Sequence, residues 1–161
     1  MRLFIVRHGN YADDGSRDPP LSSSGRKQAA DAGTVIGMHS RVRNVFSSPL
    51  RRAVMTAEII SDAVAAEHII MDCLEPEADA DGFIDVLHKD TVHDIAAVGH
   101  LPNLRLIYSR LSPRNGPERL NIGIGGIACL NLSLSAEKLV SAHEWTLTSD
   151  QLNELSAHDS R

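Results

Sequence analysis

The segment LFIVRHG, residues 3–9, decides the fold and holds the first candidate functional residues. Its four consecutive apolar residues predict a short strand that is covered on both faces, and the polar RHG that follows predicts a turn. Two later segments repeat this arrangement of an apolar run, a polar turn and the start of a helix: VFSSPLRRA at 45–53 and AVGHLP at 97–102. The chain therefore places polar side chains directly after three of its expected strands.

These polar side chains are expected to meet in one place. Ligands of open α/β sheets bind outside the carboxyl ends of the strands, where the turns that follow parallel strands share one edge. The side chains that could gather at this edge are Arg7, His8, Arg52 and His100. The sequence thus predicts a local cationic site in a chain whose formal net charge is -5.

The rest of the chain alternates short apolar runs with longer segments of helical periodicity. Strands are expected at 3–6, 44–46, 68–71, 95–98, 127–134 and 139–147, and helices at 22–38, 49–66, 79–88 and 102–111. Such alternation predicts an α/β fold, a three-layer α/β/α sandwich with a mostly parallel central sheet. We expect a single domain over 1–148, with a loop at 112–126, and a loose polar C-terminal tail over 149–161.

The helix expected at 49–66 has the clearest pattern. Its apolar residues recur with the 3.6-residue period of an amphipathic helix, at Leu50, Ala53, Val54, Ala57, Ile60 and Val64. Ser48 is suited to the N-cap of this helix, and Pro49 to its first helical position. This reading places Arg52 in the first turn, where free backbone N–H groups and the helix dipole favour an anion.

Composition and charge exclude several classes of protein. A net charge of -5 argues against a general nucleic-acid binder, which would carry a basic surface. The two cysteines, Cys73 and Cys129, are too few for a disulfide framework and are expected to be buried or partly buried free thiols. The histidines show no metal-ligand spacing, so we expect neither a metal nor another cofactor. No apolar run approaches the length of about 20 residues that spans a membrane, which predicts a cytoplasmic protein with no membrane partner.

The ordered motifs resemble those of the histidine phosphatase superfamily, also called the phosphoglycerate mutase-like family. RHG at 7–9 is similar to the signature of that family, and VGH at 98–100 matches its third motif. The segments at 21–29 and 47–57 are similar to its motifs L-T-x-x-G-x-x-Q-A and S-x-L-x-R-A-x-Q-T-A, with Met55 in place of the second motif's glutamine. Order and spacing fit over residues 2–134, and the compact size most resembles the SixA-type phosphohistidine phosphatases.

This resemblance implies a role for each residue of the site. His8 would be the nucleophile that takes up the phosphoryl group, since a neutral imidazole is nucleophilic near pH 7 and histidine forms covalent intermediates. Arg7 and Arg52 would hold the phosphate through planar, permanently charged guanidinium groups, with Gly9 also part of the binding site. His100 would donate a hydrogen bond to the transferring phosphoryl group as an imidazolium.

The proton donor is left open by the sequence. Many members of the family place a glutamate after the third strand, where it protonates the leaving oxygen. The corresponding segment here, LEPEADAD at 74–81, has no clean match to that pattern. The candidates for a general acid are Glu75, Glu77 and Asp79, with Asp81 nearby, and a site without a general acid is the other reading.

The resemblance therefore implies a metal-independent phosphatase that acts on phosphohistidine in proteins, with a phosphohistidine-carrying signalling protein as its expected partner. Three alternatives stand beside this reading: a small-molecule phosphomonoesterase, a mutase of the same superfamily, and a non-catalytic phospho-binding module. The short stretch from Leu74 to His100 leaves little chain for the lid of a mutase. The presence of all four pocket residues argues against a module that only binds.

Overall fold

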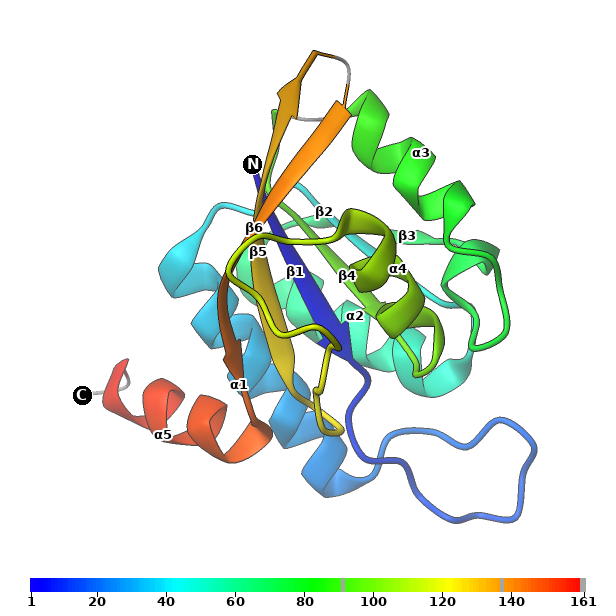
Figure 1. Cartoon of the computed structure of the whole chain (residues 1–161). Coiled ribbons are helices and arrows are strands. Elements are labelled where there is room, and N and C mark those ends of the chain that lie inside the picture. The colour runs from blue at the N-terminus through cyan, green and yellow to red at the C-terminus, as the bar shows by residue number, and fades with distance from the viewer. Residues whose placement is uncertain (91, 137, 160–161) are drawn as a thin grey trace.

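A six-stranded sheet lies between two layers of helices in the computed structural model, which describes residues 1–90, 92–136 and 138–159 (Figure 1). The strands are β1 (Arg2–Arg7), β2 (Asn44–Ser47), β3 (Glu67–Ile70), β4 (Ile95–Gly99), β5 (Ile127–Ser135) and β6 (Lys138–Leu147). The helices are α1 (Ser23–His39), α2 (Arg51–Val64), α3 (Asp81–Lys89), α4 (Asn103–Leu111) and α5 (Ser149–Asp159), with a single 3₁₀ turn η1 (Asp72–Leu74).

The sheet has the strand order β3-β2-β4-β1-β5-β6. The first four strands in this order are parallel, whereas β5 pairs antiparallel with β1 and β6 pairs antiparallel with β5. The prediction of an α/β sandwich with a mostly parallel central sheet is therefore confirmed. In this order β2, β4 and β1 are neighbours, so the three strands that precede the polar turns lie side by side.

Strand β1 is buried on both faces, as its unbroken apolar run predicts. Leu3 and Ile5 pack in the core beneath α3 and α4, whereas Phe4 and Val6 pack on the opposite side, where α1, α2 and α5 lie. Burial of such side chains stabilises the fold by about 1.5–3 kcal/mol each. The strand that precedes the RHG turn is thus held from both sides.

Helix α2 begins two residues later than the sequence predicts. It starts at Arg51 and its N-cap residue is Leu50, so the expectation of Ser48 as N-cap and Pro49 as first helical residue is wrong. The Ser48 side chain instead lies within hydrogen-bond distance, 3.0 Å, of His100 Nε2. Arg52 is still in the first helical turn, as expected.

The loose tail expected after Thr148 is wrong for residues 149–159, which form α5 and pack against α1. Thr148 and Gln151 form a reciprocal cap at the start of this helix, because each side chain accepts the backbone N–H of the other residue. Leu152 is fully buried, and Ser156 donates a 2.8 Å hydrogen bond to Asp31 of α1. Residues 160 and 161 of the predicted tail lie outside the described residues.

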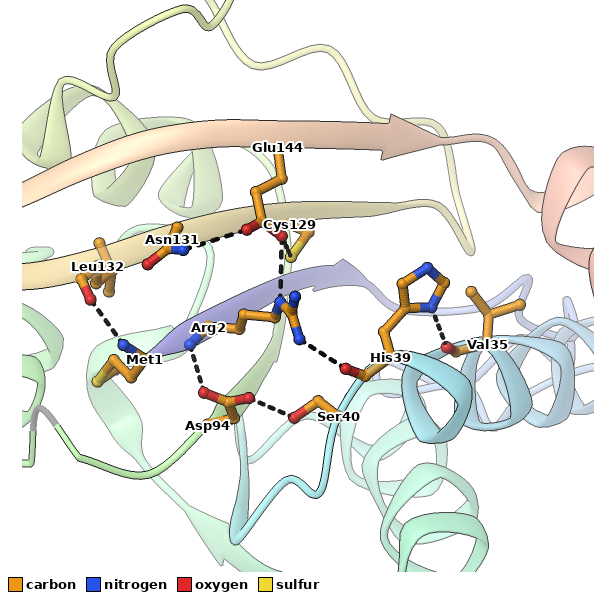
Figure 2. Close-up of polar contacts among 10 residues, drawn as sticks. All are labelled: Met1, Arg2, Val35, His39, Ser40, Asp94, Cys129, Asn131, Leu132 and Glu144. Atoms are coloured by element: carbon orange, nitrogen blue, oxygen red, sulfur yellow. Dashed lines mark hydrogen bonds and ion pairs between the residues drawn. The ribbon is translucent and has the colours of Figure 1, made fainter.

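A polar network holds together the edge of the sheet that lies opposite the RHG turn (Figure 2). The Arg2 guanidinium donates to the backbone oxygen of His39 at 2.7 Å and pairs with Glu144 at 3.3 Å, so it ties β1 to α1 and β6. Cys129 is a buried free thiol that donates to the same Glu144 carboxylate, and burial raises its pKa far above the ordinary thiol value. This cysteine is therefore an unreactive part of the packing.

The packing of α5 can be tested with a matched pair of leucines. Leu152→Ala should lower the free energy of unfolding by about 2–5 kcal/mol, because it leaves a cavity beneath the helix. Leu155→Ala, on the exposed side of the same helix, should change that free energy by no more than about 0.5 kcal/mol. Urea denaturation of the two variants measures the difference. Equal effects would mean that α5 does not contribute to the core.

Candidate active site

The turns after β1, β2 and β4 meet at the carboxyl edge of the sheet. Arg7 is paired in register with Gly99, and Ser47 with Val98, so the three strands end at the same level. The next residue after β1 is His8 and the next after β4 is His100, and the centroids of their rings are 4.8 Å apart. The structure therefore brings the two histidines of the expected site into contact.

His8 is buried and oriented by the backbone of its own turn. Its side chain is 5% exposed, and its Nδ1 lies 2.8 Å from the carbonyl oxygen of Gly9. A carbonyl can only accept, so Nδ1 carries the hydrogen and Nε2 keeps its lone pair. Burial, together with the positive charges of Arg52 and Arg7, lowers the pKa of His8 to about 4 despite the opposing hydrogen bond to Gly9. His8 is thus a neutral imidazole with a free nitrogen at pH 7.

His100 is also neutral in the free pocket. Burial, the adjacent His8 and the charges of Arg52 and Arg7 lower the pKa of His100 to about 3. The expectation of an imidazolium at His100 concerns the site with a phosphoryl group bound, and it stays a prediction. Opposite charge favours the protonated form, so a phosphate dianion bound beside His100 would raise its pKa.

The two arginines reach the site from different elements. Arg7, at the end of β1, donates from Nη1 to the carbonyl oxygen of Ile122 at 3.3 Å. Arg52, in the first turn of α2, has Nη1 at 3.7 Å from a carboxylate oxygen of Asp18 and Cζ at 5.4 Å from the ring centroid of Tyr11. The charges of both arginines act on both histidines, so all four side chains share one electrostatic environment.

Three nitrogen atoms of this site are buried without a hydrogen-bond partner. Among the described residues these are Arg7 Nε and Arg52 Nε, which are donors, and His100 Nδ1, which is a donor in one of the two neutral tautomers. A buried donor without a partner costs about 1–3 kcal/mol, and more where the group is charged. A ligand with several acceptor oxygens, such as a phosphoryl group, would satisfy these donors together.

The RHG turn is fixed by a close backbone contact. A Cβ atom on Gly9 would lie 2.6 Å from the carbonyl oxygen of Gly25 in α1, so neither a side chain nor a shift of the turn is tolerated here. The Gly9 N–H donates to Thr56 Oγ1 at 3.1 Å, and that hydroxyl donates in turn to the Arg52 carbonyl oxygen at 2.7 Å. Gly9 therefore joins β1, α1 and α2, and its contact with substrate stays a prediction.

The acidic segment after β3 is attached to the start of α4. Asn103 donates from Nδ2 to the carbonyl oxygens of Cys73 and Ala78, and the loop between them carries Glu75 and Glu77. The carbonyl oxygen of Leu74 lies close to Gly99, only 3.3 Å from the position that a Cβ on Gly99 would take. Because Glu75 follows Leu74, its backbone begins beside the end of β4.

The other candidate acids have partners elsewhere. Asp79 accepts the backbone N–H of Asp81 at 3.1 Å, and Asp81 pairs with Arg110 of α4 at 3.1 Å. These two carboxylates support the start of α3 and its packing on α4. Glu75 and Glu77 therefore stay candidates for a general acid, whereas the carboxylate of Asp79 already accepts a hydrogen bond at the start of α3.

Sequence reasoning missed several residues that shape this site. Tyr11 and Asp18 come from a loop without periodicity, and no spacing in the sequence indicates that this loop turns back over Arg52. Ser48 was assigned to a helix cap, although it contacts His100. Asn103 and Arg105 lie in α4 directly after the VGH motif, and their place after that motif was the available signal.

The described residues contain neither a metal-binding cluster nor a membrane-spanning helix. No group of three or more His, Cys, Asp or Glu side chains in the described ranges is arranged to hold a metal ion, and a metal-free reaction stays a prediction. Within those ranges, no helix combines the length and the apolar character needed to cross a membrane.

Comparison with known proteins agrees with this geometry. Residues 3–81, which include Arg7, His8 and Arg52, match the model of the histidine phosphatase superfamily (branch 1). An uncharacterised protein of Picosynechococcus is 32% identical over 117 residues, 65% of this chain and 68% of the relative. The phosphohistidine phosphatase SixA of Escherichia coli is 28% identical over 127 residues, 73% of this chain and 78% of that protein.

The fold comparison covers nearly the whole chain. The structure of the protein histidine phosphatase SixA complexed with tungstate superposes with a TM-score of 0.78 and 22% sequence identity, covering 94% of this chain and 99% of the other. That similarity concerns the fold alone, and it extends beyond residue 81 to the part of the sheet that contains β4 and the two antiparallel strands. The chain is a phosphatase that belongs to the histidine phosphatase superfamily.

Proposed function

We propose that the chain hydrolyses a phosphorylated substrate through a phosphohistidine formed on His8, without a metal. The observation that carries this proposal is a buried, neutral His8 in contact with His100 and under the charges of Arg7 and Arg52, each of which has a buried nitrogen without a partner among the described residues. A neutral imidazole supplies the nucleophile, and the unused donors of Arg7, Arg52 and His100 supply stabilisation of the transferring phosphoryl group.

The proposed reaction has two steps. In the first, the lone pair of His8 Nε2 attacks phosphorus, the bond to the leaving group breaks, and the leaving group departs with that electron pair and gains a proton. In the second, water attacks phosphorus and loses a proton, the N–P bond breaks, and its electrons return to Nε2. Arg7 and Arg52 hold the phosphoryl oxygens throughout, which is the positioning that phosphoryl transfer requires.

His100 is proposed to donate from Nδ1. Ser48 Oγ accepts the backbone N–H of Leu50 at 3.3 Å, which leaves the Ser48 hydroxyl hydrogen free to be donated to His100 Nε2. Nδ1 then carries the imidazole hydrogen, and this buried atom is without a partner among the described residues. In this arrangement a neutral His100 already donates to a phosphoryl oxygen, and its protonation on substrate binding strengthens the bond.

We propose phosphohistidine on a protein as the substrate. Imidazole is an easy leaving group, because its conjugate acid has a pKa near ~6.5, whereas an alkoxide is a base almost as strong as hydroxide, with a pKa near ~15.7 for water. A site that shows no defined general acid is better suited to releasing imidazole than to releasing an alkoxide. The similarity to a protein named phosphohistidine phosphatase supports this choice. The cytoplasmic location stays a prediction.

One observation favours a second candidate, a small-molecule phosphomonoesterase. The loop that carries Glu75 and Glu77 is attached by Asn103 beside the end of β4, where a carboxylic acid could protonate a leaving oxygen. The mutase is less well supported, because only η1 and the nine-residue helix α3 lie between β3 and β4. A purely binding module would have no use for a nucleophilic His8.

The nucleophile is tested by His8→Ala. This variant should lose at least about a thousandfold in kcat/KM toward p-nitrophenyl phosphate, because the covalent route is removed. It should still bind tungstate by calorimetry, since Arg7, Arg52 and His100 remain. His88→Ala, on the exposed side of α3, is the matched control and should keep full activity. Substantial activity in His8→Ala would place the nucleophile elsewhere.

The protonation states are tested by titrating ¹⁵N-labelled histidines by NMR. The pKa of His8 is lowered, so its imidazole should stay neutral as the pH falls through ~6.5 and take up a proton only near pH 4. His100 should be protonated at still lower pH, near 3. Saturating tungstate should raise the pKa of His100, because a bound anion favours the imidazolium. A midpoint near 6.5 for His8 in the free protein would contradict the buried, neutral nucleophile.

The leaving group is tested by comparing kcat/KM for a phosphohistidine protein with values for alkyl and sugar phosphates. We expect the phosphohistidine protein to be preferred and to be hydrolysed equally well by Glu75→Gln and Glu77→Gln variants, because imidazole needs little acid assistance. Asp79→Asn, whose carboxylate is engaged with α3, is the matched control. If alkyl phosphates are preferred and one glutamate variant selectively loses that activity, the phosphomonoesterase assignment replaces this one.

A further inference from the structure

Arg105 lies beside the proposed phosphate site without being part of it. It is in the first turn of α4, which begins three residues after His100. Arg105 Nε donates to the carbonyl oxygen of Leu120 at 3.0 Å, while Arg7 Nη1 donates to that of Ile122 at 3.3 Å. Two guanidinium groups are therefore attached to the same short segment of loop. Burial is the largest cause that lowers the pKa of Arg7, and the positive charge of Arg105 is the second. This effect agrees with the proximity of the two arginines.

Arg105 lines an open groove beside α4. This groove has a volume of about 530 Å³ and is lined by Pro102, Arg105, Leu106, Ser109, Glu118 and Arg119. It contains two arginines and one carboxylate, so its local charge is positive in a chain of net charge -5. Among the described residues, neither terminal nitrogen of Arg105 has a hydrogen-bond or ion-pair partner, although Nε is held in place.

The positive charge of Arg105 has no carboxylate partner of its own. Arg52 is paired with Asp18, whereas no ion pair is formed by Arg105 among the described residues, and its charge acts on Arg7. Like charges held this close repel each other, and this repulsion costs free energy unless a ligand compensates. A substrate that carries a second anionic group would pair with Arg105 and remove that repulsion.

We propose that Arg105 is a specificity-determining residue that binds a second anionic group of the substrate, in the groove next to the transferred phosphoryl group. This proposal rests on the proposed function. The planar guanidinium, fixed through Nε, presents its remaining N–H groups in the geometry that suits a carboxylate or a phosphate. Either anion fits the same chemistry: an acidic side chain next to the phosphorylated residue, or a second phosphate.

The competing explanation is that Arg105 only braces the loop at 112–126. A brace would position Arg7 through Ile122 and would affect every substrate to the same extent. A specificity residue affects only those substrates that carry the second anion. The two roles therefore separate in the ratio of kcat/KM between acidic and neutral substrates.

The experiment uses the full chain and three phosphohistidine peptides that differ at one neighbouring residue: glutamine, glutamate or phosphoserine. Wild type should prefer the glutamate or phosphoserine peptide over the glutamine peptide by about tenfold, equivalent to about 1.4 kcal/mol. Arg105→Gln should abolish this preference, and Arg105→Lys should retain part of it. Arg110→Gln, which removes another arginine of α4, one that is paired with Asp81 of α3, should leave the preference intact. Whichever anionic peptide shows the larger ratio identifies the source of the second anion.

A charge reversal sharpens the test. Arg105→Glu should invert the preference, so that a peptide with lysine at the neighbouring position is favoured over the glutamate peptide. Equal kcat/KM for all three peptides in wild type would overturn the proposal, and so would a uniform loss across peptides in Arg105→Gln.

Binding measurements separate this proposal from the proposed function. The same peptide set, with a phosphoryl-triazole in place of phosphohistidine, is not hydrolysed, and its dissociation constants can be measured by calorimetry. If no phosphohistidine peptide is hydrolysed, the proposed function fails, while a preference for acidic triazole peptides that Arg105→Gln removes still supports the second-anion site. Equal dissociation constants across that set would overturn it.

Discussion

The contact between the backbones of Gly9 and Gly25 is the constraint on which the site depends. It leaves no space for a Cβ on either residue, since a Cβ on Gly25 would lie 1.9 Å from the carbonyl oxygen of Asn10. Helix α1 can therefore press directly on the turn after β1, and the turn has one available position. The Gly9 carbonyl then fixes the ring of His8 through Nδ1 and leaves Nε2 as the reactive nitrogen.

Burial keeps the imidazole of His8 in the neutral form that the proposed attack requires. An exposed histidine next to two arginines would still be partly protonated below pH 7, and a protonated imidazole is not a nucleophile. The buried position of His8 disfavours its charged form, and the arginines disfavour it further. The arginines themselves keep their charge, because a guanidinium cannot be deprotonated under ordinary conditions. The site is thus positive at the two arginines and neutral at His8, which suits the proposed attack of His8 on a phosphoryl group.

Much of the fold was predictable from the sequence because it depends on local patterns. The unbroken apolar run of β1 indicates a strand covered on both faces, and Arg7, His8, Arg52 and His100 follow strands whose ends meet at one edge. Helix α5 was missed because its sequence is mostly polar, and over residues 149–158 only Leu152 and Ser156 are buried. The Thr148–Gln151 cap was the signal that could have identified it.

The details of the site were less predictable, because they depend on contacts between distant segments. Ser48 is a good helix cap by local preference, but its contact with His100 links β2 to β4 and appears only when the sheet is assembled. The Asp18–Arg52 pair joins a loop without periodicity to α2. The lowered pKa of His100 in the free protein was not predictable either, since it depends on burial and on three neighbouring groups that are distant in the sequence or not weighed by a motif.

In the proposed mechanism, the free site disfavours a protonated histidine, whereas the occupied site favours one. Before substrate binds, the two arginines and the burial of the pocket keep His8 and His100 neutral. A phosphoryl dianion cancels the arginine charges, so the electrostatic penalty on an imidazolium falls when the substrate arrives. His8 is then bonded to phosphorus, or aligned with it, through Nε2, whereas His100 is free to take up a proton. In the proposed mechanism, the same cationic pocket therefore keeps the nucleophile neutral when it is empty and favours a protonated donor when it is filled.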